Sequence, residues 1–162
     1  MLSSLKKRLR TGSFALLAVV LIASAATRPH ISERAAAPLL SGAQVDDRVL
    51  AIIARSCGDC HSDATRYPWY SYVAPVSWLV TRDVIQGRER LNLSKWSDYP
   101  TLRRQRLLSE IANQVRDEEM PLPLYTLLHP GAKLSKPDAD AIFDWTQMER
   151  ARLISASAMG RS

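Results

Sequence analysis

The sequence predicts an all-α fold. Four segments carry apolar residues at helical spacing, and no segment shows the alternation of apolar and polar residues, bounded by turns, that is typical of a β-hairpin. The chain has 162 residues with 46% hydrophobic content, enough for one compact domain with its own core. We therefore expect one small helical domain without internal repeats.

The first 25 residues have the pattern of an export signal. A basic stretch over 6–10 precedes an apolar run over 14–23 and the triplet Ala23-Ser24-Ala25, which fits an A-x-A cleavage site. The apolar run is shorter than the roughly 20 residues that a membrane-spanning helix needs. We expect cleavage after Ala25 and export to the periplasm, whereas an uncleaved segment would anchor the chain in the inner membrane.

The formal net charge of +6 belongs mainly to this segment. Four of the 22 Lys and Arg residues lie within 1–25, where there is no acidic residue, so the remainder carries 18 basic and 16 acidic side chains. A nucleic-acid-binding surface needs clustered positive charge, and the remainder has no long basic run. We expect no binding to nucleic acid.

Residues 26–44 form a predicted flexible linker, because they contain Arg28-Pro29, Pro38 and Ser41-Gly42 and show no sustained apolar period. The predicted domain covers 45–153, with a flexible tail over 154–162. Its first helix has one face formed by Val49, Ile52, Ile53, Ser56, Cys57 and Cys60.

Asp46 and Asp47 suit the positive end of this helix, so the two cysteines are expected at its C-terminal end.

Three later segments complete the predicted bundle. Ala74-Pro75 opens a helix that runs toward Gly87, with an apolar stripe formed by Val76, Leu79, Val80 and Val84. A second helix over 101–117 places Leu108, Ile111, Ala112 and Val115 on one face. The last has Ser135 as its N-cap and Pro137 in its first turn, and should end near Leu153. Its predicted apolar side consists of Ala141, Ile142, Trp145 and Met148.

The segment Cys57-Gly58-Asp59-Cys60-His61 carries the chemistry. Two thiols at this spacing can add to the two vinyl groups of a haem, and the adjacent imidazole is then held against the iron. C-x-x-C-H is the signature of c-type haem attachment, and predicted export supports it independently. We expect one covalently bound haem c, attached through Cys57 and Cys60, with His61 as an axial ligand.

Two other interpretations of the cysteine pair are weaker. A local disulfide or half of a zinc site is the first, but a zinc site would need further ligands from His30, His129 or a carboxylate, and there is no second cysteine pair. A thioredoxin-type dithiol is the second, but its first cysteine normally begins a helix after a strand, whereas here the predicted helix precedes the cysteines.

An electron-carrying haem needs a second axial ligand, and the candidates are Met120, Met148, Met159, His30 and His129. We expect Met120, because it follows a charged run and precedes Pro121-Leu122-Pro123, on an irregular segment that can aim a side chain into a pocket. His129 is the alternative. Met148 is expected to pack in the core.

Other residues have expected supporting roles. Aromatic side chains can cover a haem face or form ordinary core: Tyr67, Trp69, Tyr70, Tyr72, Trp78, Trp96 and Tyr99. His61 should donate its second ring N–H to a backbone carbonyl near Tyr67-Pro68 or Ala74-Pro75. Arg66 could neutralise a haem propionate.

The chain resembles the small bacterial haem-binding domain proteins of the cytochrome c type over about 45–148. The resemblance rests on the successive motifs Cys57-Gly58-Asp59-Cys60-His61-Ser62, Thr65, Tyr67-Pro68-Trp69-Tyr70, Ala74-Pro75-Val76-Ser77-Trp78-Leu79, Leu91-Asn92-Leu93-Ser94, Trp96, Met120-Pro121-Leu122, Tyr125, His129 and Leu134-Ser135. It implies covalent haem in an all-α cytochrome c-like domain, with His61 and Met120 as iron ligands.

These features favour a non-enzymatic, one-electron carrier with a single haem, acting with an unidentified redox partner protein. The alternative is a haem-based sensor of small molecules or a peroxidase-like enzyme, in which the sixth iron position is open or displaceable. A module without haem is the third class. An uncleaved N-terminal segment would add a membrane contact.

Overall fold

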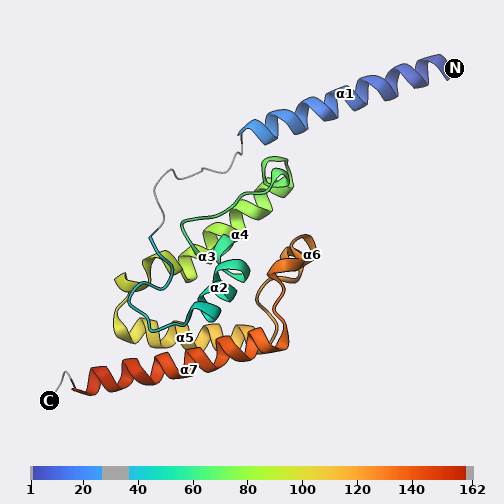
Figure 1. Cartoon of the computed structure of the whole chain (residues 1–162). Helices are drawn as coiled ribbons and strands as arrows, with labels where there is room; N and C mark the ends of the chain where they lie inside the picture. Colours follow the sequence, from blue (N-terminus) through green and yellow to red (C-terminus); the bar gives the residue numbers. More distant parts are fainter. Residues whose placement is uncertain (1, 27–36, 160–162) are drawn as a thin grey trace. The chain divides into compact units, whose positions relative to one another are not determined.

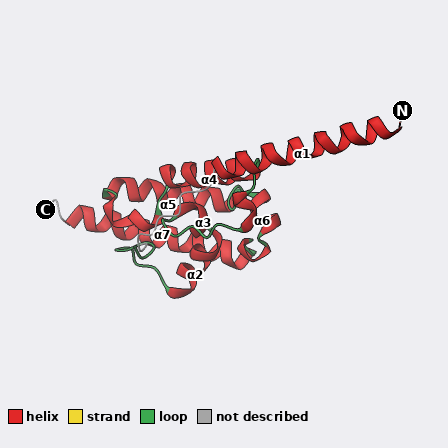
Figure 2. Cartoon of the chain, turned by 90° about the horizontal axis from the view of Figure 1, so that it is seen from above, coloured by secondary structure: helices red, strands yellow, loops and turns green. Residues whose placement is uncertain are grey.

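The structure is a computed structural model that describes residues 2–26 and 37–159. The described residues form α-helices and short 3-10 helices and no strand, so the all-α prediction is confirmed (Figure 2). The elements are α1 (Leu2–Ala26), α2 (Asp47–Ser56), α3 (Gly58–His61), η1 (Trp69–Tyr72), α4 (Val76–Arg90), η2 (Leu93–Asp98), α5 (Thr101–Arg116), α6 (Pro123–Leu128), η3 (Pro130–Ala132) and α7 (Lys136–Met159). Figure 1 labels the α-helices.

The chain divides into two compact units, which are treated separately. The first unit comprises Met1–Glu33 and Arg66–Gln86, and the second comprises Arg34–Thr65 and Gly87–Ser162. The expected linker over 26–44 lies partly outside the described residues.

The first unit contains α1, whose apolar side chains are exposed, Phe14 and Ile22 among them. Its C-terminal end is tied to the segment before α4, because Ser24 Oγ accepts a hydrogen bond from the Ala74 backbone N–H at 3.0 Å. Among the described helices, none combines the length and the apolar character needed to cross a membrane.

The predicted stripe on α4 is only partly correct. Val84 is buried, but Val76 is 38% exposed, and the second buried position is Ser77. Ser77 and Val84 stand seven residues apart, on the same side of the helix. A pattern that counts apolar residues alone misses a face on which a small polar residue is buried.

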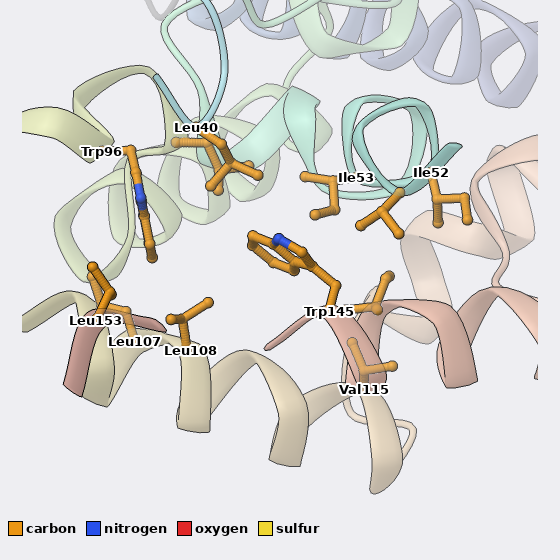
Figure 3. Close-up of a cluster of buried hydrophobic side chains, with 12 residues drawn as sticks. Leu40, Ile52, Ile53, Trp96, Leu107, Leu108, Val115, Trp145 and Leu153 are labelled. Atoms are coloured by element: carbon orange, nitrogen blue, oxygen red, sulfur yellow. The ribbon is translucent and has the colours of Figure 1, made fainter. Parts of the chain in front are cut away.

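The second unit is built around a core shared by α2, α5 and α7. Its buried side chains are Leu40, Val49, Ile52, Ile53, Leu93, Trp96, Leu107, Leu108, Val115, Ile142, Trp145 and Leu153 (Figure 3). Trp145 projects from α7 toward Ile53 and Leu108, and its indole N–H donates to the Gln44 carbonyl at 2.8 Å (Figure 3). Burial of such large apolar surfaces is the main favourable term in the folding of this unit.

The helix α2 begins where the sequence predicts. The Asp46 carboxylate accepts a hydrogen bond from the Val49 backbone N–H at 2.8 Å, which caps the helix. The predicted inner face is confirmed up to Ser56, since Val49, Ile52, Ile53 and Ser56 are all buried.

The helix α5 packs along α7 (Figure 1). Its predicted face is confirmed, because Leu108, Ala112 and Val115 are buried and Ile111 is half-buried against the core.

Two expectations for α7 are wrong. The helix continues to Met159, beyond the expected end near Leu153, and Met148 is 63% exposed instead of packing in the core. Its buried side instead carries Glu149, whose carboxylate receives two hydrogen bonds of 2.6 Å from Arg152. A buried carboxylate requires such a partner, and an apolar pattern does not reveal it.

The start of α7 is tied to α2 near the cysteine motif. Ser135 and Asp138 cap the helix reciprocally, with Ser135 Oγ donating to Asp138 Oδ2 at 2.7 Å and the Asp138 N–H donating to Ser135 Oγ at 3.3 Å. Arg55, near the end of α2, donates to the same carboxylate at 2.7 Å. The hydrogen bonds from Ser135 and then the contact with Arg55 hold the pKa of Asp138 below its usual range.

Because the folded-state pKa is lowered, the Asp138 carboxylate stabilises the fold above its unfolded pKa, and this contribution disappears as the pH falls. We expect Asp138→Asn to lower the free energy of unfolding at pH 7 by about 1 kcal/mol, the usual contribution of a helix cap. The difference between variant and wild type should shrink as the pH falls through about 4. Thermal unfolding followed by circular dichroism across this range measures it.

Asp140→Asn is the matched control, because Asp140 makes only an exposed pair with Lys136. Equal losses in both variants at pH 7 would contradict the assigned role of Asp138.

Candidate functional site

The cysteine motif lies at the junction of two helices in the second unit. Cys57 ends α2, with its N–H donating to the Ile53 carbonyl at 2.9 Å, and α3 follows at once. The Cys57 carbonyl then accepts from the N–H of His61 at 2.9 Å and from that of Cys60 at 3.3 Å. One backbone carbonyl therefore closes the turn that brings the two thiols and the imidazole together.

The ring of His61 is oriented by a backbone carbonyl. Its Nδ1 lies 3.0 Å from the carbonyl oxygen of Leu91. A carbonyl can only accept, so Nδ1 carries the proton, and Nε2 keeps a lone pair for a metal. The expected type of partner is present, but the carbonyl belongs to Leu91 and not to the regions of Tyr67-Pro68 or Ala74-Pro75.

Gly87 allows the end of α4 to approach the motif. A Cβ atom at Gly87 would lie 2.8 Å from the carbonyl oxygen of Cys60 and 3.3 Å from its carbonyl carbon. Any larger residue would push against backbone and not against a flexible side chain. The absence of a side chain at Gly87 thus sets the distance between α3 and the helix that leads to Leu91.

Polar contacts fix the loop that follows His61. The Ser62 hydroxyl donates to the Gly58 carbonyl at 2.7 Å, and the Thr65 hydroxyl donates to the Asp59 carbonyl at 2.6 Å. Arg88 then bridges the loop, donating to the Ser62 carbonyl and to Thr65 Oγ1 at 2.8 Å each. These hydrogen bonds fix the loop over 62–65 against the turn between the two cysteines and against Arg88.

Asn92 fixes the segment next to Leu91 through its polar contacts. It is buried, its side-chain amide donates to Asp63 at 2.8 Å, and its side-chain oxygen accepts from the Ser94 N–H at 3.0 Å. Its own N–H donates to the Tyr99 hydroxyl at 2.9 Å. Asn92 therefore holds the segment whose preceding carbonyl orients His61.

Two residues of the motif, Cys57 and His61, line a cavity of about 520 Å³, which we call the His61 cavity, whereas Cys60 is not in its described lining. This volume lies within the range of cofactor and ligand sites. Its lining consists of Ser56, Cys57, His61, Arg90, Leu91, Leu107, Glu110, Ile111, Asn113, Gln114, Val115, Met120 and Pro121. All of these belong to the second unit, and leucine, isoleucine and valine side chains supply much of the wall.

Met120 is the methionine that this cavity brings together with His61. It lies beyond α5 on an irregular segment, as expected, and its N–H donates to the Gln114 carbonyl at 3.1 Å. Met120 as a residue is half-buried, and the bond from Met120 to Pro121 is a cis peptide. The end of α5 therefore delivers a thioether to the cavity that His61 lines.

None of the other candidate ligands that the structure describes lines the His61 cavity. Met148 and Met159 are exposed on α7, and His30 lies outside the described residues. His129 does not line the cavity, and it stacks on Tyr125 with ring centroids 4.3 Å apart while its Nδ1 donates to the Tyr125 carbonyl at 3.1 Å.

Tyr125 also reaches the motif, because its hydroxyl donates to the Asp59 carboxylate at 2.8 Å. The pair Tyr125 and Asp59 therefore ties α6, which follows Met120, to the turn between the two cysteines.

The aromatic residues do not form the cavity wall. Trp96 is fully buried in the core, and Trp69 and Trp78 are 78% and 52% exposed in the first unit. Arg66 also belongs to the first unit, and the arginine that lines the cavity is Arg90. None of the seven aromatic side chains is in the lining described for the His61 cavity, and their covering of a cofactor stays a prediction.

The Cys57 thiol is unsuited to dithiol exchange. Burial, and then the neighbouring Cys60, raise the pKa of Cys57 to about 12, so the thiol is protonated at neutral pH. Redox-active cysteines have lowered pKa values, because the thiolate is the nucleophile.

Among the described residues, no group of three or more His, Cys, Asp and Glu side chains is arranged to hold a metal ion.

Ser56 shows that the cavity suits a bound molecule. Its side chain is 4% exposed and lines the cavity, yet its hydroxyl has no hydrogen-bond partner within the described part of the chain. A buried unpaired polar group costs about 1–3 kcal/mol, which a polar group on a ligand would offset. Apolar walls, an imidazole nitrogen, a thioether sulfur and a thiol together fit a large flat cofactor that carries iron.

Sequence reasoning missed several residues of this site, among them Ser56, Gly87, Arg90 and Glu110. Ser56 appeared only as part of a helix face, and Gly87 only as a helix end. Gly87 and Arg90 are separated from the cysteine motif by many residues, and no local spacing links them to it.

A family model described as a haem-binding domain matches residues 15–148. A search of curated proteins found no match, and neither did a search of solved structures.

We expect Gly87→Ala to destabilise the second unit by about 1–3 kcal/mol, the usual cost of overpacking, because the new methyl group meets the Cys60 carbonyl. The control is Gly131→Ala, since a Cβ there meets nothing within 4 Å. Chemical denaturation of both variants measures the difference. An unchanged stability of Gly87→Ala would show that α4 can move away without cost.

Proposed function

Because the chain belongs to the haem-binding domain family, we propose that it is an exported c-type cytochrome with one haem that carries single electrons. The observation that carries this proposal is that one cavity is lined by His61, Met120 and Cys57. When bound, the haem supplies a reversible one-electron change at its iron.

In this proposal Cys57 and Cys60 attach the cofactor. Each thiol adds across one vinyl group, with sulfur bonding to one carbon and the proton going to the other, so no oxidant is consumed. Cys57 lines the cavity, and α3 sets its spacing to Cys60. Two covalent links would keep the cofactor in place where free haem is scarce.

His61 would hold the iron through Nε2. The hydrogen bond from Nδ1 to the Leu91 carbonyl fixes the tautomer and limits rotation of the ring. Donation to a carbonyl also increases the basicity of the coordinating nitrogen. The chain thus presents a neutral imidazole in one orientation.

Met120 would complete the ligand set. Ligation by a thioether together with an imidazole would favour the reduced metal and raise the reduction potential relative to ligation by two imidazoles. The apolar side chains of Leu107, Ile111 and Val115 line the cavity beside Met120 and would limit the access of water to the cofactor. A filled ligand set with little water around it favours electron transfer without bond making.

The compartment is part of the proposal. The basic stretch, the apolar run and the small residues at 23–25 support export to the periplasm, with cleavage after Ala25 or retention as an inner-membrane anchor. The acting partner would be another redox protein.

The decisive experiment is expression in the periplasm with haem-attachment machinery, followed by haem staining of a denaturing gel and optical spectra of both oxidation states. Covalent haem with the weak long-wavelength band of iron–methionine charge transfer supports the carrier. Covalent haem with a high-spin spectrum and rapid binding of carbon monoxide favours a sensor or peroxidase-like enzyme. No covalent haem would refute the proposal.

Met120→Ala should leave the haem attached but remove the charge-transfer band, because the iron loses its thioether ligand. We also expect faster carbon monoxide binding to the ferrous protein by at least about tenfold, since no ligand has to be displaced. Met148→Ala is the matched control, as Met148 is exposed on α7. Identical spectra of Met120→Ala and wild type would assign the sixth ligand to another residue.

Replacement of both Cys57 and Cys60 by Ala should abolish haem staining under denaturing conditions, because no thioether can form. Circular dichroism of the purified variant establishes whether the helices are retained. Persistent staining would contradict covalent attachment at this motif.

A further inference from the structure

A second cavity, of about 420 Å³, adjoins the His61 cavity. It is lined by Arg90, Pro100, Leu102, Arg103, Arg106, Leu107 and Glu110. Three of these residues, Arg90, Leu107 and Glu110, also line the His61 cavity. We call this second cavity the arginine pocket. The three shared residues place the arginine pocket next to the site of the proposed cofactor.

The arginine pocket has excess positive charge. Arg90 ends α4, whereas Arg103 and Arg106 lie one turn apart on α5, and Glu110 is the one carboxylate in the lining. Within residues 37–159, neither Arg90 nor Arg106 makes an ion pair, and the guanidinium of Arg103 stands 4.5 Å above the Tyr99 ring. Planar guanidinium groups that make no ion pair within the protein are suited to bind carboxylates through two parallel hydrogen bonds.

The His61 cavity itself provides little for an anion. Arg90 is the one Lys or Arg side chain in its described lining, where Glu110 carries the opposite charge. The side-chain amide of Gln114 already donates to Glu119, and Leu91, Leu107, Ile111 and Val115 make much of the rest apolar. A haem carries two propionate carboxylates, and a carboxylate buried without a partner is strongly disfavoured. The propionates therefore need either solvent or the cations at the Arg90 side.

We propose that Arg90, Arg103 and Arg106 bind the propionate carboxylates of the haem. This inference rests on the proposed function. The shared lining of the two cavities favours it over a surface that docks an acidic protein, because a docking surface would not need Arg90 to line the cofactor cavity as well. Arg66, which the sequence suggested for this role, belongs to the first unit.

Such contacts would influence the iron as well as hold the cofactor. A fixed positive charge next to each propionate offsets part of the negative charge near the metal. Because reduction adds an electron to the iron, this positive charge favours the reduced state. Removal of one arginine should therefore shift the equilibrium toward ferric iron.

The test uses the haem-loaded full chain with Arg106→Gln and Arg90→Gln. At a fixed ambient potential, the ratio of ferrous to ferric protein should fall by about threefold to tenfold, the order that Coulomb's law gives for one unit charge within about 10 Å. Resonance Raman spectra should show a shift of the propionate bending mode, which reports hydrogen bonds to these carboxylates.

Two variants keep the test interpretable. Arg150→Gln removes the same charge from an exposed position on α7 and should leave both readouts unchanged. Arg106→Lys retains the charge but not the planar fork, and should restore the ferrous ratio while leaving the Raman mode shifted. Circular dichroism melting identifies any variant that fails to fold, and the lysine variant then carries the comparison.

The outcomes separate the two proposals. Wild type without covalent haem defeats the proposed function before any arginine variant is compared. Covalent haem with unchanged ferrous ratio and unchanged Raman mode in both glutamine variants overturns the propionate assignment alone. A slower reaction with ferrocyanide at low ionic strength, with those two readouts unchanged, would also overturn it and assign the pocket to docking of an acidic partner.

Discussion

The hydrogen bond between His61 Nδ1 and the Leu91 carbonyl is the interaction on which the site depends. It selects the ring tautomer and directs Nε2, and so decides whether the imidazole can hold a metal. The carbonyl is in place because Gly87 lets α4 approach Cys60 closely and because Asn92 holds the chain just beyond Leu91. The motif supplies the imidazole, and a distant segment orients it.

The hydrophobic core determines what faces that imidazole. Side chains of α2, α5 and α7 form one core that includes Trp145 of α7. This core holds α5 and α2 in the same packed unit. The end of α5 then carries Met120 to the cavity lined by His61. The cap formed by Ser135 and Asp138, joined by Arg55, fastens α7 to the end of α2 two residues before Cys57. The packing of the helices therefore decides that Met120 and His61 line the same cavity.

Charge is distributed unevenly around the cavity. Much of its wall is apolar, and its charged residues, Arg90 and Glu110, are both shared with the arginine pocket, where Arg103 and Arg106 add positive charge. The buried hydroxyl of Ser56 adds an unpaired polar group inside. An apolar interior with a cationic edge matches a flat molecule that is apolar except for carboxylates at one side, and this agrees with the family to which the chain belongs.

The sequence by itself determined the elements with a local signal: the all-α class, the capped start of α2, the inner face of α5, and the place of Cys57 at the end of α2. Each depends on periodicity or on neighbours along the chain. Cys60 and His61 lie in the separate helix α3, which the sequence did not predict. Tertiary structure alone decided that Leu91 orients His61, that Glu149 is buried and Met148 exposed, and that Arg90 lines the cavity in a unit separate from Arg66. These facts depend on residues far apart in the chain, and their proximity is created only when the helices pack.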